Sequence, residues 1–292
     1  MSSSYIATEI HYHVRSISLP SRLQHPSSQK IEGELKRLKS WDASSLPSSS
    51  LQSEDMKAGL KGLAELYNSV HELIVCPLTQ EALIHQNHHV EKPLDMSVQL
   101  LDVCGSAREL LLLMKEQVLE LQSALRRKGL DSSINSQLCG YICFRKKAKK
   151  DITKSIKVLK TMECSIKSYS HSLLDVDHHL LMVINVLKEL STITISFFQK
   201  LLNFMCGKNT RGWSMFSKMV STNEMDGIDI ALCSFHRCIR KNDAKVDVQI
   251  VKRRLGELDG SIIELELGLD CLFRCLIQHR VSLLNLLTSS MF

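Results

Sequence analysis

Hydrophobic side chains recur every three or four residues over most of the chain beyond Leu94, which is the spacing of one face of an α-helix. The clearest stripe lies near the C-terminus, where only His279 is polar. Its members are Val248, Val251, Leu255, Leu258, Ile262, Leu265, Leu269, Leu272, Leu276, His279, Leu283 and Leu286. At 1.5 Å per residue, this helix would be roughly 55 to 60 Å long. Such a helix must bury its stripe against partners of comparable length.

Three further long helices are predicted upstream. The first carries an apolar stripe from Ala107 to Leu125 and stops at Gly129, and the second spans roughly 133–169. The third runs from Leu173 to Phe204 and closes at Gly207, with only Thr194 departing from the apolar pattern. Because the connections between these helices are short, consecutive ones are expected to be antiparallel neighbours.

The N-terminal part of the chain is more interrupted. Short helices are predicted over 30–41, 54–75 and 78–85, with a Ser/Pro-rich linker between the first two. The segment QNHHVEKP, residues 86–93, is predicted to be a loop. A second irregular stretch, 208–243, is expected to be a long connection with short amphipathic pieces around Trp213 and Phe216.

These elements predict an all-α fold, an elongated bundle of about four long antiparallel helices with shorter N-terminal helices. Residues 1–28 are rich in serine and lack helical periodicity, so we expect an extended or disordered arm there and a single helical-bundle domain over 29–292. With 44% hydrophobic residues, the 292-residue chain can fill a large core. The last stripe could also be covered by a second chain, which leaves both a monomer and a coiled-coil dimer open.

The composition favours an intracellular protein. Ten cysteines are spread over a long chain with no secretory h-region and no Asn-x-Ser/Thr sequon, which indicates a reducing compartment. We expect the cytoplasm first, and the nucleus, the membrane periphery and a plastid remain open. The most apolar region, 180–206, is interrupted by Lys188, Glu189 and Lys200, so no transmembrane segment is predicted.

A net charge of +6 is modest for this length, but the basic residues cluster in RKKAKK and DITKSIKVLK. On a helix the lysines fall on one broad face, which comprises Lys146, Lys147, Lys149, Lys150, Lys154, Lys157 and Lys160. The face could bind anionic lipid headgroups, nucleic acid or an acidic partner, or it could be the solvated exterior of a bundle helix. Nucleic acid ranks below lipid or protein because aromatic residues are only 5% and no nucleic-acid-binding motif accompanies the lysines.

Two further polar features are ambiguous. Cys139 and Cys143 precede the basic run, and acylation of either would add a second membrane signal to the lysines. Buried, unmodified thiols are the favoured interpretation, because free cysteine is usually interior. His279 could fix the register of the last seam, or its side chain could reach out to solvent near a frayed end.

No motif indicates catalysis, a cofactor or a metal, so we predict a non-enzymatic protein without any of these sites. Phosphate-binding loops, dinucleotide-binding glycine patterns and nucleophile elbows are absent from the sequence. Histidines do cluster, but without the paired spacing of metal ligands. The histidines concerned are His85, His88, His89, His178 and His179, the last two near Asp175 and Asp177.

The segment RSISLP matches the R-S-x-S-x-P pattern that 14-3-3 proteins bind after phosphorylation of its second serine. Arg15, Ser16, Ser18 and Pro20 provide the pattern, and a phosphate on Ser18 would present acceptor oxygens to an arginine cluster. Two alternatives stay open: an unmodified arm pinned into a groove of the bundle by its apolar residues, and an organellar transit peptide.

Three stretches are similar to a known family: YHVRSISLPSRLQHPSSQKIEGELKRLKSW, GLAELYNSVHELIVCPLTQEAL and LLDVCGSARELLLLMKEQVLELQSALRR. The landmarks are Arg15, Ser16, Ser18, Leu19, Pro20, Ser21, Arg22, Trp41, Leu101, Asp102, Cys104, Gly105, Arg108 and Glu109. The chain resembles the plant-specific domain-of-unknown-function family related to the Bypass-like proteins. The resemblance implies a plant protein linked with root or shoot development and no established enzymatic activity.

The leading hypothesis is therefore an intracellular regulatory or scaffold protein whose arm docks on protein partners after phosphorylation. The alternative is a peripheral membrane protein that binds anionic lipids through the basic helix face.

Overall fold

The computed structural model describes residues 26–44, 51–86, 88–128, 134–168, 177–207, 223–241 and 248–289. These residues form eight α-helices and no strand, which confirms the all-α prediction. The helices are α1 (Pro26–Ser44), α2 (Ser53–Ile74), α3 (Pro77–His85), α4 (His88–Lys128), α5 (Ile134–Ser168), α6 (His178–Cys206), α7 (Glu224–Lys241) and α8 (Val248–Ser289).

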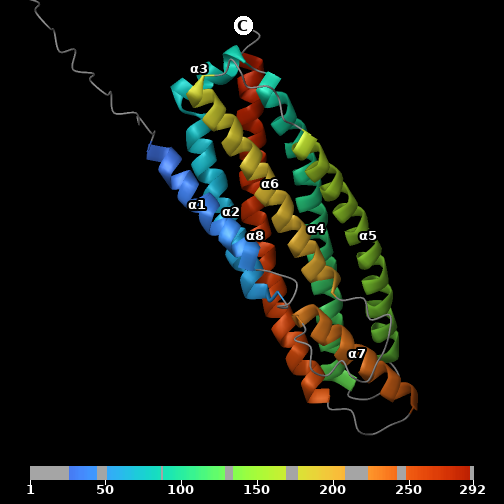
Figure 1. Ribbon diagram of the computed structural model, residues 1–292. Helices are drawn as coiled ribbons and strands as arrows, with labels where there is room; N and C mark the ends of the chain where they lie inside the picture. Colours follow the sequence, from blue (N-terminus) through green and yellow to red (C-terminus); the bar gives the residue numbers. More distant parts are fainter. Residues whose placement is uncertain are drawn as a thin grey trace, which may run out of the picture.

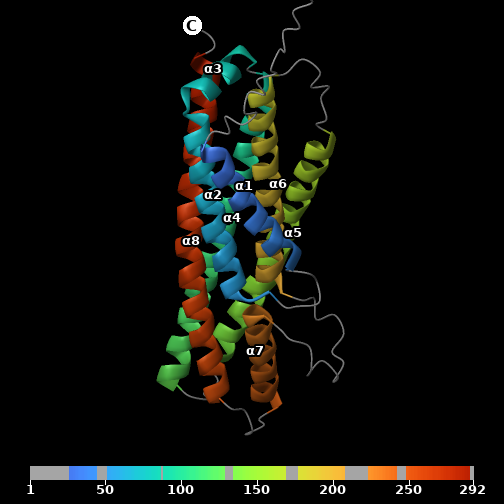
Figure 2. The same cartoon turned by 60° about the vertical axis from the view of Figure 1, so that its left-hand side comes forward.

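Four of these helices are long, as predicted, and they alternate in direction through the bundle. α4 and α6 run one way, and α5 and α8 run the other (Figure 1). The neighbour relations define two layers: α2, α8 and α4 lie side by side in one, and α1, α6 and α5 in the other. α5 therefore lies at an outer edge of the bundle (Figure 2).

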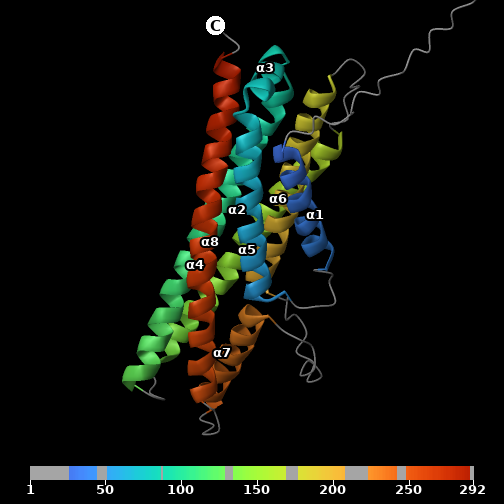
Figure 3. The same ribbon diagram turned by 90° about the vertical axis from the view of Figure 1, so that its left-hand side faces the viewer.

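The apolar stripe of α8 is buried within the chain almost as predicted. α4 follows one side of α8 over most of its length, from a bond between Arg280 and the carbonyl of Leu94 to one between Gln122 and the carbonyl of Leu255. The other side is shared. α7 covers the first part of α8, α2 the middle and α3 the end (Figure 3).

Part of the long connection that the sequence predicted over 208–243 is helical, because residues 224–241 form α7. Its buried hydrophobic residues, Met225, Ile228, Leu232 and Phe235, follow the three-or-four spacing, but the stripe is short and flanked by polar residues. α6 stops at Cys206, and α7 lies beyond that end against the start of α8 (Figures 2 and 3). The predicted pieces around Trp213 and Phe216 lie outside the described residues.

Two other boundaries differ from prediction because proline is tolerated near a helix start. α4 begins at His88 and contains Pro93, so most of the predicted loop is helical. Pro93 is the sixth residue of α4, in its second turn, and lacks the N–H that would donate to the carbonyl of His89. α1 begins at Pro26, so the last three residues of the predicted arm belong to this helix. Residues 1–25 lie outside the described part.

α6 is long and apolar enough, by length and composition alone, to cross a membrane, although the charges near its middle had predicted otherwise. In the bundle, 61% of its most apolar window is buried. α6 contacts α1, α2, α4 and α5, so its apolar character is that of a helix surrounded by other helices.

The polar exceptions in the two apolar stripes both meet Tyr67 of α2. Thr194 places its hydroxyl 3.1 Å from the Tyr67 hydroxyl, and the His279 ring packs edge-on against the tyrosine ring with centroids 5.4 Å apart. His279 is buried, so the interpretation that it reaches out to solvent was wrong. Burial, with a smaller contribution from His71, lowers the pKa of His279 to about 4.

The buried His279 should make the bundle less stable in mild acid. The unfolded chain takes up this proton near pH 6.5 and the folded chain only near pH 4, so stability is lost as the pH falls between these values. We expect His279→Leu to remove about 2 kcal/mol of the stability difference between pH 7 and pH 5, measured by urea denaturation. His85→Gln, at an exposed histidine, is the control. An unchanged pH dependence in His279→Leu would contradict the assignment.

Candidate anion-binding face of α5 and its buried anchor

The buried side of α5 contains a cation. Its stripe consists of Ile134, Leu138, Tyr141, Arg145, Ala148, Ile152, Leu159, Met162 and Ile166. Arg145 is the first residue of RKKAKK, and only 4% of it is exposed. A buried guanidinium needs a counter-charge and partners for its N–H groups.

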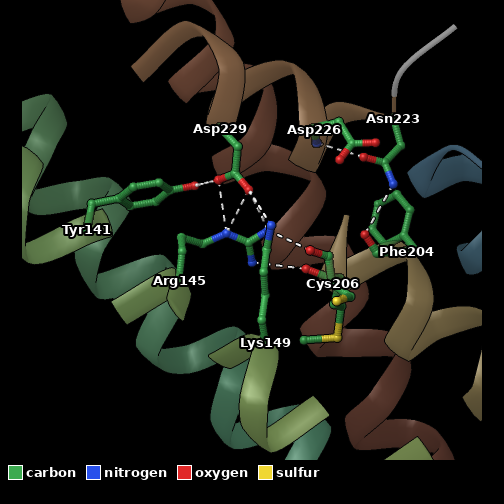
Figure 4. Close-up of polar contacts among 9 residues, drawn as sticks. Tyr141, Arg145, Lys149, Phe204, Cys206, Asn223, Asp226 and Asp229 are labelled. Carbon is green, nitrogen blue, oxygen red and sulfur yellow. Dashed lines mark hydrogen bonds and ion pairs between the residues drawn. The ribbon is translucent and has the colours of Figure 1, made fainter. Parts of the chain in front are cut away.

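Asp229 of α7 supplies the counter-charge in a two-pronged contact. Nε of Arg145 donates to both carboxylate oxygens at 2.9 and 3.1 Å, and Nη2 donates to Oδ2 at 2.9 Å. The hydroxyl of Tyr141, one helical turn earlier on α5, donates to Oδ1 of Asp229 at 2.9 Å (Figure 4). Charge-assisted bonds of this geometry are the strong class of hydrogen bond. They fix α7 against α5.

Arg145 also donates hydrogen bonds to the last carbonyl groups of α6. Nη1 donates to the carbonyl of Met205 at 2.9 Å, and Nη2 donates to the carbonyl of Cys206 at 3.4 Å. The last carbonyls of a helix lack helical partners and carry partial negative charge, so a cation there is favourable. Asn223, just before α7, donates to the carbonyl of Phe204 at 3.2 Å (Figure 4). One arginine thus joins α5, α6 and α7.

The turn after α6 requires glycine. Gly207 has φ of +68°, and a side chain there would place its Cβ 2.5 Å from Oδ1 of Asp226. Asn223 accepts a bond from the backbone N–H of Asp226 at 2.7 Å and so caps the start of α7. The end of one helix and the start of the next are therefore locked by backbone geometry as well as by charge.

A cleft of about 180 Å³ lies between α5 and α7 beside the Arg145–Asp229 ion pair. Its lining includes several titratable groups, and three of them, Tyr141, Arg145 and Lys149, contact the carboxylate of Asp229. Burial, then Asp229, raises the pKa of Tyr141 well above its usual value. Burial is the largest effect and by itself would lower the pKa of Arg145, but the charge interactions with Asp229 and Tyr141 and the hydrogen bonds to Asp229 together raise it. Burial also raises the pKa of the Cys233 thiol, so the cleft offers no activated nucleophile among these groups.

The opposite side of α5 faces solvent and carries the predicted lysines. Lys149 is the exception, because it is half-buried and lies 3.7 Å from Asp229. The others are exposed and are here called the lysine face: Lys146, Lys147, Lys150, Lys154, Lys157 and Lys160. Only Lys154 of this set forms an ion pair between described residues, with Asp151 at 2.9 Å.

Cys139 and Cys143 are exposed, so the interpretation of both as buried thiols was wrong. The signal that could have placed them was available in the sequence. Steps of three and four from Leu138 lead to Tyr141 and then to Arg145, all on the buried side of the helix. Cys139 and Cys143 are not reached by these steps and lie on the opposite side.

The remaining candidates divide into two groups. The N-terminal pattern Arg15, Ser16, Ser18 and Pro20 lies outside the described residues. Among the residues that the structure does describe, no three histidines, cysteines or acids come together as a metal site. His179 instead lies 2.9 Å from the hydroxyl of Thr79 through Nε2, and Asp177 caps α6.

These features define a class of protein: an all-α bundle with one strongly basic edge helix held in place by a buried ion pair. A family model described as "Protein BPS1" matches residues 59–286, more than three quarters of the chain. The chain belongs to this family, a plant family of the Bypass type, which confirms the resemblance seen in the sequence. The match includes the landmarks from Leu101 to Glu109, whereas RSISLP and Trp41 precede it. Neither the curated proteins nor the solved structures give a match.

The buried ion pair between Arg145 and Asp229 should show energetic coupling between its two residues. We expect Arg145→Leu to lower the free energy of unfolding by about 3 to 5 kcal/mol, because it leaves the Asp229 carboxylate buried without its cation. Asp229→Leu should cost a similar amount, and the double variant should cost clearly less than the sum. Urea denaturation measures all three. Lys150→Leu on the lysine face is the control and should change stability by less than about 0.5 kcal/mol. Strict additivity of the two single substitutions would contradict the coupling.

Proposed function

We propose that this protein is a non-enzymatic regulatory or scaffold protein that binds anionic membrane surfaces through the lysine face of α5. The observation that carries the proposal is the location of the charge. α5 contains nine lysines and arginines against two acids and so carries +7, whereas the whole chain carries +6. The rest of the protein is close to neutral, so its basic character resides in this helix.

The arrangement suits a planar partner. α5 has 35 residues and lies at an edge of the bundle (Figures 1 and 2). The lysine face is exposed on one side of this helix. A lysine near an anionic membrane surface contributes about 1 kcal/mol. Several lysines that reach the surface together, without rearrangement of the fold, would bind cumulatively.

Lipid is favoured over nucleic acid by what surrounds the lysines. Bases are usually held by stacking on exposed aromatic rings. On this part of α5, Tyr141 is buried and Phe144 is half-buried. Arg145, whose guanidinium could hold a phosphate in two-pronged fashion, is committed to Asp229 and to the end of α6. What remains is a set of point charges, which suits a dense layer of anionic headgroups.

A non-enzymatic role in root or shoot development is compatible with the Bypass-type family. The α5–α7 cleft supports the same proposal, because Tyr141 and Arg145 are bonded to Asp229 and Arg145 also binds a carbonyl at the end of α6.

Removing part of the lysine face should weaken binding to anionic vesicles. We expect the full chain to float with phosphatidylserine-containing vesicles at low salt and to be released as salt is raised. Lys147→Gln, Lys150→Gln and Lys157→Gln together should reduce partitioning on the order of 100-fold, at about 1 kcal/mol per lysine.

The matched control changes the charge equally elsewhere. Lys36, Lys61 and Lys188 are exposed on α1, α2 and α6, and replacing all three with glutamine should reduce partitioning far less. Equal losses in the two triple variants, or a wild-type protein that stays in solution with anionic vesicles at low salt, would rule out the lysine face as the membrane-binding surface.

A second candidate function rests on RSISLP and concerns the arm alone. Here the protein would dock on a 14-3-3 partner after phosphorylation of Ser18, with the phosphate held by an arginine cluster. We expect phosphorylated full-length protein to bind 14-3-3 in a pull-down and Ser18→Ala to abolish capture, while Ser16→Ala retains it. Capture that survives Ser18→Ala would exclude this motif.

A further inference from the structure

We propose that Cys139 and Cys143 are sites of S-acylation by a long-chain fatty acid, which would anchor the membrane-facing side of α5. This inference rests on the proposed function, because it names the covalent anchor that would act together with the lysine face. Its evidence is the position of the exposed thiols on that helix.

Exposed cysteines are concentrated on one helix of this protein. All ten cysteines are free thiols, and only Cys139, Cys143, Cys164 and Cys271 are exposed. Three of these four lie on α5, although free cysteine is among the most frequently buried residues. An exposed thiol gives nothing to the core, so its presence calls for another explanation.

The three thiols of α5 lie on the same line as the lysines. Steps of four, three, four, seven and seven residues keep to one side of a helix. They connect six residues, all exposed: Cys139, Cys143, Lys146, Lys150, Lys157 and Cys164. Acyl chains on Cys139 or Cys143 would therefore point toward the same surface as the ammonium groups. A single acyl chain binds a membrane only marginally, and a polybasic patch beside it supplies the second signal needed for stable attachment.

The surroundings of Cys139 and Cys143 favour S-acylation more than those of Cys164 do. From Ile134 to Lys150 α5 contains no acidic residue, whereas Cys164 directly follows Glu163. The sulfur of Cys139 lies 3.7 Å from Nε2 of His236 on α7. An imidazole at this distance can hydrogen-bond the thiol and accept its proton while the sulfur attacks the acyl carbon.

The chemistry requires only an acyl donor. The cysteine sulfur attacks the carbonyl carbon of a long-chain acyl-coenzyme A thioester, a new sulfur–carbon bond forms, and the bond to the coenzyme A sulfur breaks. The thiol proton passes to the departing coenzyme A thiolate. The step exchanges one thioester for another and involves no change in oxidation state.

Mass-tag acyl exchange on full-length protein from plant cells tests the assignment. Free thiols are blocked, thioesters are cleaved with neutral hydroxylamine, and the released thiols are coupled to a polymer that shifts the band. We expect one or two hydroxylamine-dependent tags in the wild type, in Cys164→Ser and in Cys271→Ser. Cys139→Ser/Cys143→Ser should carry none.

Two results would overturn the inference: wild-type protein without hydroxylamine-dependent tags, and tags that persist in Cys139→Ser/Cys143→Ser. Thiols released by a reductant but not by hydroxylamine also count against it, because they indicate disulfides. The purified, unacylated double variant should melt and bind anionic vesicles as the unacylated wild type does, which excludes misfolding as the cause of lost tags. Vesicle binding without tags would overturn acylation alone, whereas absence of vesicle binding would overturn the proposed function.

Discussion

The apolar row of α8 has to be covered along 42 residues, and the rest of the bundle is arranged around that requirement. α4, with 41 residues, follows one side of α8 over most of its length. The other side needs three helices in succession, since α2 has only 22 residues and α3 only nine. α7 completes the cover at the beginning of α8, which explains why the chain places a helix there after α6 has ended.

Because several helices share the cover of α8, the end of α6 and the start of α7 meet beside α5, and Arg145 binds both helices there. Where α6 stops and α7 begins, helix-end carbonyls are brought to the interior next to α5. A buried arginine satisfies them, and Asp229 balances its charge. α5 therefore has two different basic sides. On one side Arg145 is buried and holds three helices together, and on the other side six lysines are exposed. The proposed membrane-binding surface depends on this separation.

The long helices could be predicted from sequence because their stripes are long and nearly uninterrupted, as in α8 and α6. α7 was missed because its four buried hydrophobic residues form too short a pattern to stand out from polar surroundings. Arg145 was grouped with its lysine neighbours by charge, although its spacing from Tyr141 and Ile152 places it in the buried stripe. Asp229 could not be assigned as its partner, because that pairing depends on where α7 packs, which no local pattern encodes.

The central claim is that the seam of α8 is filled by helices of the same chain. Sedimentation and far-ultraviolet circular dichroism of the full chain, followed together over a wide dilution series, test it most directly. The account predicts a 33.1 kDa species that keeps its full helical signal at the lowest concentration. Helical signal that disappears in step with dissociation of a larger species would show that a second chain covers the seam, and would contradict the account.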